Sequence, residues 1–234
     1  MRRRNKTRQE HNDAPEPEFS PGRITSVSTQ TRNSSRVSVF IEGAFSFGCF
    51  KAVFLASGLA VGRELDAASY AALMKEEARF KLREYWLGLL GRRAHTAAEL
   101  VRKARQKDYD ASQFERVLQE FRERNYLNDE AFARAYIQEM STIKKWGPAK
   151  LKLELRKRGV SDEVSNPLIA ALIPEDDISA LEALVRKNSR RFKRESDILK
   201  RKKKIADHLL RKGHKPEQVF RHLDHFLEIV SQQP

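Results

Sequence analysis

Apolar positions recur along the chain at intervals of roughly fifty residues, each time around a break between two amphipathic runs. Repetition of this length predicts an array of helical units, each of which buries an apolar stripe partly against its neighbour. The breaks lie at Asp108, Gly159 and Gly213. Counted from them, the matching positions are Leu100, Leu151 and Ile205 (eight residues before), Ala104, Leu155 and Leu209 (four before), Phe114, Ser165 and Val219 (six after), Leu118, Ile169 and Leu223 (ten after), and Phe121, Leu172 and Phe226 (thirteen after).

A different period precedes this array. Between Ile24 and Phe47 apolar and polar residues alternate, with a turn-rich stretch over 31–35 and a second turn at Glu42-Gly43. Alternation between such turns predicts a small antiparallel meander. Isolated strands of this kind are marginally stable, so we expect the meander to pack on the segment that follows. That segment begins with a short helix over 50–55.

Helix caps set the phase of the repeat. Thr96 and Glu99 form a candidate capping box, and Gly147-Pro148 stands at the corresponding place fifty-one residues later. Asp110 to Gln113 is a second candidate box, and Pro216 occupies the first turn of the last helix. Each unit then also needs a first helix, so the pattern predicts three helices a unit, with the first helices over 76–90, 129–143 and 176–188.

The predicted fold is therefore mainly α, with three tandem three-helix, helix-turn-helix-like repeats in an elongated curved array after a small N-terminal β-hairpin or meander. In the third repeat a basic insertion separates the first helix from the stripe of Ile198, Ile205 and Leu209. The predicted segments are a disordered tail (1–22), the β-containing segment (23–65), the first repeat (66–127), the second repeat (128–173), and the third repeat (174–230) with its insertion (189–204).

Composition narrows the class of protein. The chain has 234 residues, of which 40% are hydrophobic, which is enough for a sizeable core. No apolar run is long enough for a membrane span. The single cysteine, Cys49, excludes an internal disulfide framework and a cysteine-rich zinc site. We expect a soluble protein of a reducing compartment, the cytoplasm, with no membrane association.

Charge points to a polyanionic partner. The formal net charge is +14, and residues 190–204 hold nine Lys or Arg against two acids. One helix type in each repeat carries a basic edge, which favours nucleic acid or an acidic protein surface, although a solvated face whose long stems shield the core is the alternative. The candidate binding residues are Arg102, Lys103, Lys144, Lys145, Lys150, Lys152, Arg156, Lys157, Arg158, Lys200, Arg201, Lys202, Lys203, Lys204, Arg211 and Lys212.

Catalytic chemistry is not evident in the sequence. Phosphate-binding loops, nucleophile elbows and zinc-protease motifs are all missing. His222, His225 and Glu228 share one helix face, but His222 stands at a repeat position held elsewhere by apolar residues, so a structural histidine is favoured over a metal ligand. Cys49 lies among phenylalanines and fits a small buried side chain. We predict no catalytic residue, no metal and no cofactor.

One long segment resembles a known family. Tyr126-Leu-Asn-Asp-Glu-Ala-Phe-Ala-Arg-Ala-Tyr136, followed by Gly147-Pro148-Lys-Leu-Lys-Leu-Glu-Leu155, is similar to the RecX family, the modulators of the RecA recombinase. Arg93, Thr96, Glu99 and Leu100 also match this family. The resemblance covers about residues 24–228, and it is strongest from 92 to 173. The tail and the basic stretch are additions to the family pattern.

The resemblance implies a non-enzymatic regulator that lies in the groove of the RecA–DNA filament. There it would inhibit ATP hydrolysis, strand exchange and filament growth, in recombinational DNA repair and the SOS response. The implied partners are the RecA filament and, weakly and with salt sensitivity, single- and double-stranded DNA. We expect a monomer.

Two other functions fit parts of the sequence. Basic three-helix units are also typical of sequence-specific DNA-binding proteins. Against that alternative, the basic residues spread over three repeats, and no single helix concentrates base-reading side chains. A nuclease or other enzyme is disfavoured because the sequence lacks an acidic or metal-ligating cluster.

Overall fold

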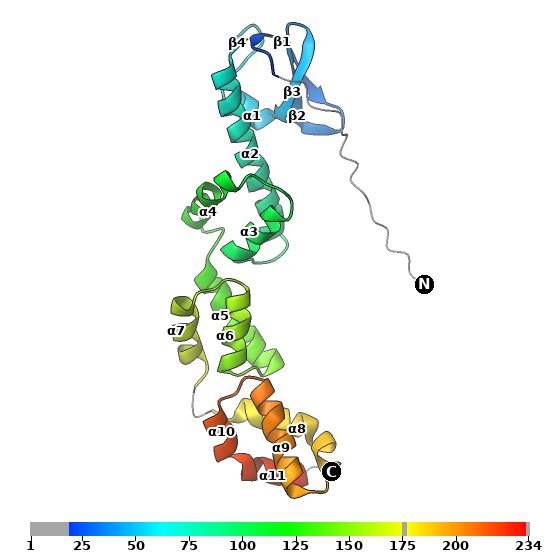
Figure 1. The fold of residues 1–234 in the computed structure, drawn as a ribbon, viewed down its shortest axis with the longest axis vertical. Coiled ribbons are helices and arrows are strands. Elements are labelled where there is room, and N and C mark those ends of the chain that lie inside the picture. Colours follow the sequence, from blue (N-terminus) through cyan, green and yellow to red (C-terminus); the bar gives the residue numbers. More distant parts are fainter. Residues whose placement is uncertain (1–18, 175–176, 233–234) are drawn as a thin grey trace, which may run out of the picture. The chain divides into compact units, whose positions relative to one another are not determined.

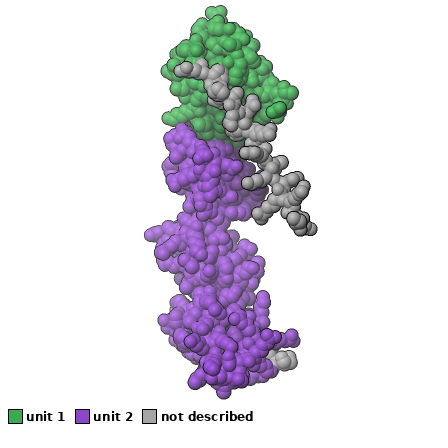
Figure 2. Space-filling view, turned by 45° about the vertical axis from the view of Figure 1, so that its right-hand side comes forward, with its two compact units in different colours: residues 1–84 green, residues 85–234 purple. Residues whose placement is uncertain are grey.

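A computed structural model describes residues 19–174 and 177–232 of the chain (Figure 1). It divides into two compact units, Met1–Glu84 and Tyr85–Pro234 (Figure 2). Most of the predicted tail lies outside the described residues. Its last part is ordered, however, because Phe19 stacks on Tyr70 with ring centroids 3.8 Å apart and the first strand begins at Gly22. The predicted boundary at residue 22 was thus too late.

The first unit contains an antiparallel sheet, which confirms the predicted meander. The strands are β1 (Gly22–Gln30), β2 (Asn33–Ile41), β3 (Ala44–Phe50) and β4 (Glu64–Leu65), in the order β3-β2-β1-β4. The predicted turn over 31–35 was too long, because β2 already begins at Asn33. β4 was not predicted, since two residues are too few to show an alternation. Glu42 and Gly43 both have positive φ, 47° and 82°, as a two-residue hairpin turn requires.

One face of the sheet packs on α1 (Lys51–Ala56) and on the first part of α2 (Ala67–Leu90). α2 begins earlier than the predicted 76, since an Asp66 side-chain oxygen accepts the Ser69 N–H at 2.7 Å. Cys49 is completely buried in this core, and burial raises the pKa of its thiol to about 12. The prediction of a small buried side chain at this position is confirmed.

The second unit consists of helices joined by short turns and loops, with no strand among the residues that the structure describes. The predicted repeats hold unequal numbers of helices, since a break at His222 divides the last predicted helix in two. After the end of α2 come α3 (Ala97–Arg105), a 3-10 turn η1 (Ala111–Gln113), α4 (Phe114–Glu123), α5 (Asp129–Lys144), α6 (Pro148–Lys157), α7 (Asp162–Leu172), α8 (Ser179–Lys193), α9 (Ile198–Arg211), α10 (Pro216–Arg221) and α11 (Leu223–Gln232).

The phase of the repeat is confirmed by burial and by backbone conformation. The three breaks, Asp108, Gly159 and Gly213, all adopt the left-handed region, with φ of 56°, 81° and 87°. The apolar side chains four and eight residues before each break are 0% exposed, namely Leu100, Ala104, Leu151, Leu155, Ile205 and Leu209.

The predicted caps are confirmed in part. The Thr96 hydroxyl oxygen accepts the N–H of Glu99 at 3.1 Å, whereas the Glu99 carboxylate turns to Arg93 instead of closing the box. An Asp110 oxygen accepts the Ser112 N–H, but it opens a 3-10 turn and not an α-helix. Pro148 and Pro216 occupy the first turns of α6 and α10, as predicted.

The basic stretch 189–204 is mostly helical and does not stand apart from its neighbours. α8 continues to Lys193 because Ser189 and Phe192, 5% and 1% exposed, extend its buried stripe. α9 already begins at Ile198, which is 60% exposed and not part of the buried stripe that we predicted for it. The predicted start of the first helix at 176 lies outside the described residues, and the described helix starts at Ser179.

Candidate partner-binding surface on the middle helices

Three helices, α3, α6 and α9, precede the three breaks and carry most of the predicted basic residues; we call them the middle helices. The last turn of α6 meets the first turn of α3. The Thr96 hydroxyl, at the N-terminus of α3, donates a hydrogen bond to the carbonyl oxygen of Arg158 at the end of α6. Next to it, a Cβ on Gly159 would lie 2.1 Å from the Cβ of Ala98. Only glycine therefore fits at this contact, which we call the first junction.

The last turn of α9 meets the first turn of α6 in the same way. The Gly147 N–H donates to the Lys212 carbonyl oxygen at 2.9 Å, and the Ala149 N–H donates to that of Gly213 at 3.0 Å. A Cβ on Gly213 would lie 2.3 Å from the backbone nitrogen of Lys150. This second junction thus excludes any side chain at the break.

The two junctions use equivalent positions. In each, the residue just before one middle helix donates a hydrogen bond to the carbonyl oxygen of the residue just after the next middle helix. The donor is Thr96 and the acceptor Arg158 in the first junction, and Gly147 and Lys212 take these places in the second. Carbonyl groups at a helix C-terminus otherwise lack partners, so each junction satisfies one of them. The second junction also satisfies an N–H group in the first turn of α6, that of Ala149. Each junction places a partly negative helix end against a partly positive one. Successive middle helices are therefore joined end to end.

A buried carboxylate strengthens the first junction. The Glu99 side chain is 6% exposed and lies 2.9 Å from Arg93 Nη1 and 3.9 Å from Arg158 Nε. The Arg158 guanidinium also lies 4.5 Å above the ring of Tyr136 and 3.3 Å from Glu154. Arg158 was predicted as a partner-binding residue, and the structure places it in this contact between repeats.

The other predicted cations of α6 form ion pairs on the protein itself. Lys150 and Lys157 lie 3.3 and 3.0 Å from a Glu154 oxygen. Lys152 and Arg156 lie 3.2 and 2.7 Å from an Asp162 oxygen. Hydrogen bonds from Lys157 and from Arg156, the largest contributions, lower the pKa values of Glu154 and Asp162. Exposed pairs of this kind are weak, so a polyanion can still compete for the cations.

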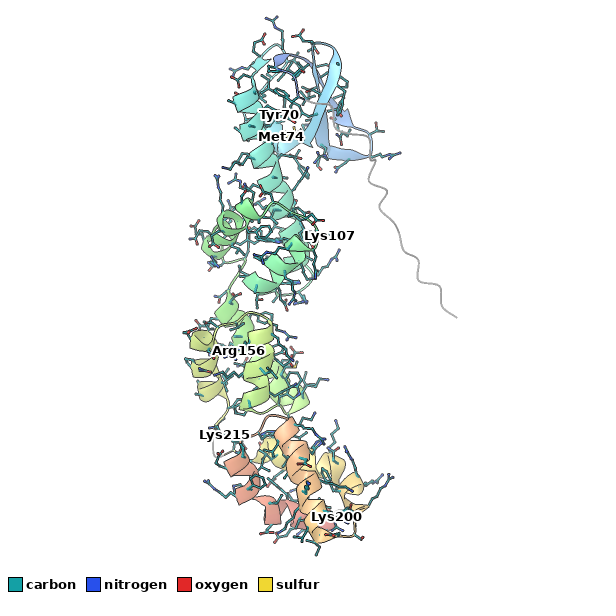
Figure 3. The ribbon with its side chains drawn as sticks, viewed as in Figure 1. Tyr70, Met74, Lys107, Arg156, Lys200 and Lys215 are labelled. Atoms are coloured by element: carbon teal, nitrogen blue, oxygen red, sulfur yellow. The ribbon has the colours of Figure 1, made fainter. Side chains whose placement is uncertain are left out.

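The predicted cations of the first middle helix and of the end of α5 are differently placed. Arg102, Lys103, Lys144 and Lys145 have no ion-pair partner among the residues that the structure describes. Arg102 and Lys144 are exposed, and the other two are half-buried. Figure 3 labels Lys107 just after α3, Arg156 near the end of α6 and Lys200 near the start of α9.

In the third repeat the predicted cations fall into two groups. Lys202 pairs with Asp224 and Lys204 with Glu195, each at 2.6 Å, while Lys200 lies 3.9 Å from Asp197. Arg201 donates to the Glu195 carbonyl oxygen. Lys203, Arg211 and Lys212 have no ion-pair partner within the described part of the chain.

A cavity of about 750 Å³ adjoins the second junction. Trp146, Ile169 and Ile173 give it an apolar wall, and His214 and Lys215 line it from the turn after α9. Residues of α6 and of this turn both line the cavity, so its shape depends on the junction. Trp146 packs beside Tyr136, with ring centroids 6.4 Å apart, as expected of a residue at a helix entry.

Comparison with known proteins identifies the family. Family models for the RecX N-terminal domain, the first three-helix domain and the second three-helix domain match residues 22–66, 83–121 and 128–166. A regulatory protein RecX from Halalkalibacterium halodurans is 30% identical over 82% of this chain and 73% of its own length. The chain belongs to the RecX family. RecX relatives from Clostridium perfringens (strain SM101) and Leuconostoc mesenteroides are each 29% identical over 82% of the chain, and over 91% and 71% of their own lengths.

Solved RecX structures share the fold. The crystal structure of a regulatory protein RecX superposes with a TM-score of 0.72 and 22% identity over 87% of this chain and 98% of its own. RecX from Lactobacillus salivarius gives a TM-score of 0.58 and 20% identity over 67% of this chain and 98% of its own. The mainly helical fold with an N-terminal meander is thus confirmed. The relatives are named regulatory proteins, which supports a regulatory role for this chain.

Several residues of the two junctions were not foreseen as contacts. Neither the Thr96–Arg158 bond nor the Gly213 contact could be read from one repeat, because each joins two. Among the described residues no group of His, Cys, Asp and Glu is arranged to hold a metal ion. His225 instead lies 2.7 Å from Glu182. None of the described helices is both long and apolar enough to cross a membrane.

Proposed function

We propose that this chain binds along a RecA filament on DNA and restrains its ATP hydrolysis, strand exchange and growth. The observation that carries the proposal is the repetition of one junction, in which Thr96 meets Arg158 and Gly147 meets Lys212. The resemblance to RecA modulators supplies the identity of the partner. Recombinational DNA repair and the SOS response are the processes in which we place this role.

Repeated junctions suit a repeated partner. Because successive middle helices are joined at equivalent positions, each repeat presents an equivalent helix to its surroundings. A filament likewise presents the same surface at every protomer. Linked weak contacts then act together, since the second contact forms at the high effective concentration that the first one creates. No single repeat needs a strong site of its own.

Charge supports a target that contains DNA. Arg102, Lys103, Lys203 and Arg211 lie on middle helices and have no ion-pair partner among the described residues. Such cations attract phosphates or an acidic protomer surface, and this attraction weakens as salt screens it. We propose weak, salt-sensitive binding to free single- and double-stranded DNA and stronger binding to the filament.

The test is a titration of the chain against RecA on single-stranded DNA, with ATP hydrolysis and filament length as readouts. We expect both to fall before the chain is equimolar with RecA. A variant with Arg102→Glu, Lys103→Glu and Lys203→Glu should inhibit less. Its matched control reverses the same number of charges, with Arg122→Glu, Arg124→Glu and Arg134→Glu at exposed positions on α4, just after α4 and on α5.

Two results would contradict the proposal. ATP hydrolysis that is unchanged even at equimolar chain would exclude filament regulation. Protection of one defined duplex sequence without RecA would favour the sequence-specific DNA-binding alternative. Sedimentation of the free chain tests the associated expectation of a monomer, and fractionation of cells tests that of a cytoplasmic protein.

A further inference from the structure

The start of α9 exposes two adjacent aliphatic side chains. Ile198 is 60% exposed and Leu199 is 76% exposed, the highest value among the exposed large hydrophobic residues of the described chain. They are not displaced core residues, because the buried stripe of the same helix begins at Ile205. Their position is fixed, since an Asp197 oxygen accepts the N–H groups of Leu199 and Lys200 at 2.8 and 3.1 Å.

Cations lie on both sides of this aliphatic pair in the sequence. We call residues 190–204 the α8–α9 tip; it comprises the end of α8, the connection 194–197 and the start of α9. The two acids of the tip are already engaged, Glu195 with Lys204 at 2.6 Å and Asp197 with Lys200 at 3.9 Å. Four tip cations have no ion-pair partner within the described residues, namely Arg190, Arg191, Arg194 and Lys203.

A ligand for the α8–α9 tip must combine negative charge with accessible apolar faces. Single-stranded DNA has both, because its phosphates repeat along the strand and its bases can leave the stack. We propose that the α8–α9 tip binds single-stranded DNA, with the four free cations on phosphates and with Ile198 and Leu199 against the faces of unstacked bases. This inference assigns a binding site to the DNA of the proposed target. It rests on the proposed function, which makes DNA part of that target.

Two other polyanions fit less well. A helix that lies in a membrane interface needs a wide exposed apolar face. α9 lacks one, because Ile205, Ala206 and Leu209 are at most 4% exposed within the core. Duplex DNA would have to be unstacked before aliphatic side chains could reach its base faces, and that step opposes binding. A single strand offers these faces without that opposition.

The test is binding of the full chain, without RecA, to a fluorescein-labelled single strand of mixed sequence over a series of salt concentrations. The variant Ile198→Ser with Leu199→Ser should bind about tenfold more weakly at every salt concentration, because less apolar area is buried against the bases. The slope of log affinity against log salt should stay unchanged, because no charge is lost. In the variant Arg190→Gln with Arg194→Gln and Lys203→Gln, that slope should shrink by about 2.

Matched controls separate a binding effect from a loss of structure. Leu55→Ser removes a side chain that is 64% exposed on α1, and it should bind the strand as the parent does. Circular dichroism of all variants should match that of the parent, because the changed side chains lie outside the core. The single variant Leu199→Ser should show part of the loss.

Three outcomes would overturn the inference. One is a serine pair that binds the single strand as tightly as the parent. Another is that the serine pair loses as much affinity for the duplex of the same sequence as for the single strand. The third is that the serine pair loses affinity only for phosphatidylglycerol vesicles. Unchanged strand binding together with lost RecA inhibition would assign the pair to the recombinase, and the proposed function would stand. If the serine pair binds the single strand more weakly but the parent does not inhibit RecA, the proposed function is refuted and the inference about the α8–α9 tip stands.

Discussion

The Thr96 hydroxyl joins two helices, because it donates to the Arg158 carbonyl oxygen and accepts the N–H of Glu99. One side chain thus begins α3 and also satisfies the end of α6. At the equivalent place in the second junction, Gly147 has no side chain, and its own N–H bonds the Lys212 carbonyl. The first junction therefore depends on side-chain chemistry and the second on close backbone approach, and substitutions should affect them differently.

Thr96→Ala should weaken the first junction. It removes the cap of α3 and the bond to Arg158, and we expect the free energy of unfolding of the helical unit to fall by about 2 kcal/mol. Urea unfolding followed by circular dichroism measures this change. Thr142→Ala, at an exposed position of α5, is the control and should shift the midpoint little. Equal effects of the two substitutions would show that the junction bond adds no stability.

Gly213→Ala should disrupt the second junction. The new Cβ would meet the Lys150 backbone nitrogen at 2.3 Å, where a backbone cannot yield as a side chain can. Gly62→Ala is a matched control, because Gly62 has the same φ of +87° and no atom within 4 Å of its added Cβ. Both variants should lose about 1 kcal/mol from the left-handed conformation. Only Gly213→Ala should lose more than that in urea unfolding, and only it should also weaken inhibition of RecA.

A large part of this structure could be predicted from the sequence because it depends on local signals. The caps that set the phase, such as Pro148 in the first turn of α6, are local signals, and so are Gly159 and Gly213, which end helices in the left-handed conformation. The pairing of Glu154 with Lys150 and Arg158 also depends on a local signal, because residues four apart share a helix face. By contrast, burial at the end of a helix depends on what lies opposite, so the exposure of Ile198 could not be predicted from spacing.

Contacts between repeats could not be predicted for a related reason. The spacing of apolar residues determines which face of a helix is buried, but not which helix end meets which. Glu99 illustrates this, because the sequence places it in a capping box, whereas the structure turns it toward Arg93 and toward Arg158 of the next repeat. The assignment of the basic residues to DNA or to protein stays a prediction, because charge alone does not distinguish the two.

Glu99→Gln should destabilise the helical unit, since it removes a buried charge that faces two guanidinium groups. The side chains of Arg93 and Arg158 are 54% and 30% exposed and keep part of their hydration. This hydration limits the loss in the free energy of unfolding when the Glu99 charge is removed. We expect a loss of about 1–2 kcal/mol in the free energy of unfolding. Glu130→Gln, whose partner Arg134 lies 3.2 Å away on the surface, should cost less than about 0.5 kcal/mol. A Glu99→Gln variant as stable as the parent would exclude a stabilising role for the buried charge.

Cys49 should resist alkylation in the folded chain. Burial raises the pKa of its thiol to about 12, so the reactive thiolate stays scarce and inaccessible at pH 7 to 10. The rate of iodoacetamide labelling should therefore rise only when urea unfolds the first unit. Because the folded pKa lies above the unfolded one, the contribution of Cys49 to stability is complete below about pH 8.5 and declines as pH rises toward 12. Rapid labelling under native conditions would contradict the buried position.

His214 should make the second junction sensitive to acid. Its Nε2 lies 3.0 Å from the Lys145 carbonyl oxygen, which can only accept, so the neutral ring carries its proton on Nε2. A second proton would have to enter at Nδ1, in a ring that is 5% exposed. Burial, and then the nearby charge of Lys212, lower the pKa of His214 below the ordinary value of about 6.5. The unfolded chain therefore binds this proton at a higher pH than the folded chain.

The sign of the effect follows from that difference. As pH falls below about 6.5, the unfolded state gains a proton that the folded state does not yet bind, so the free energy of unfolding falls. His214→Gln keeps a donor for the Lys145 carbonyl but cannot take up the proton, so its loss of stability on acidification should be smaller than that of the parent. His222→Gln, which leaves the Lys145 contact intact, is the control for a histidine lost elsewhere. Urea unfolding at a series of pH values from 7.5 to 5 distinguishes these profiles, and identical curves for the parent and His214→Gln would assign the acid sensitivity to other groups.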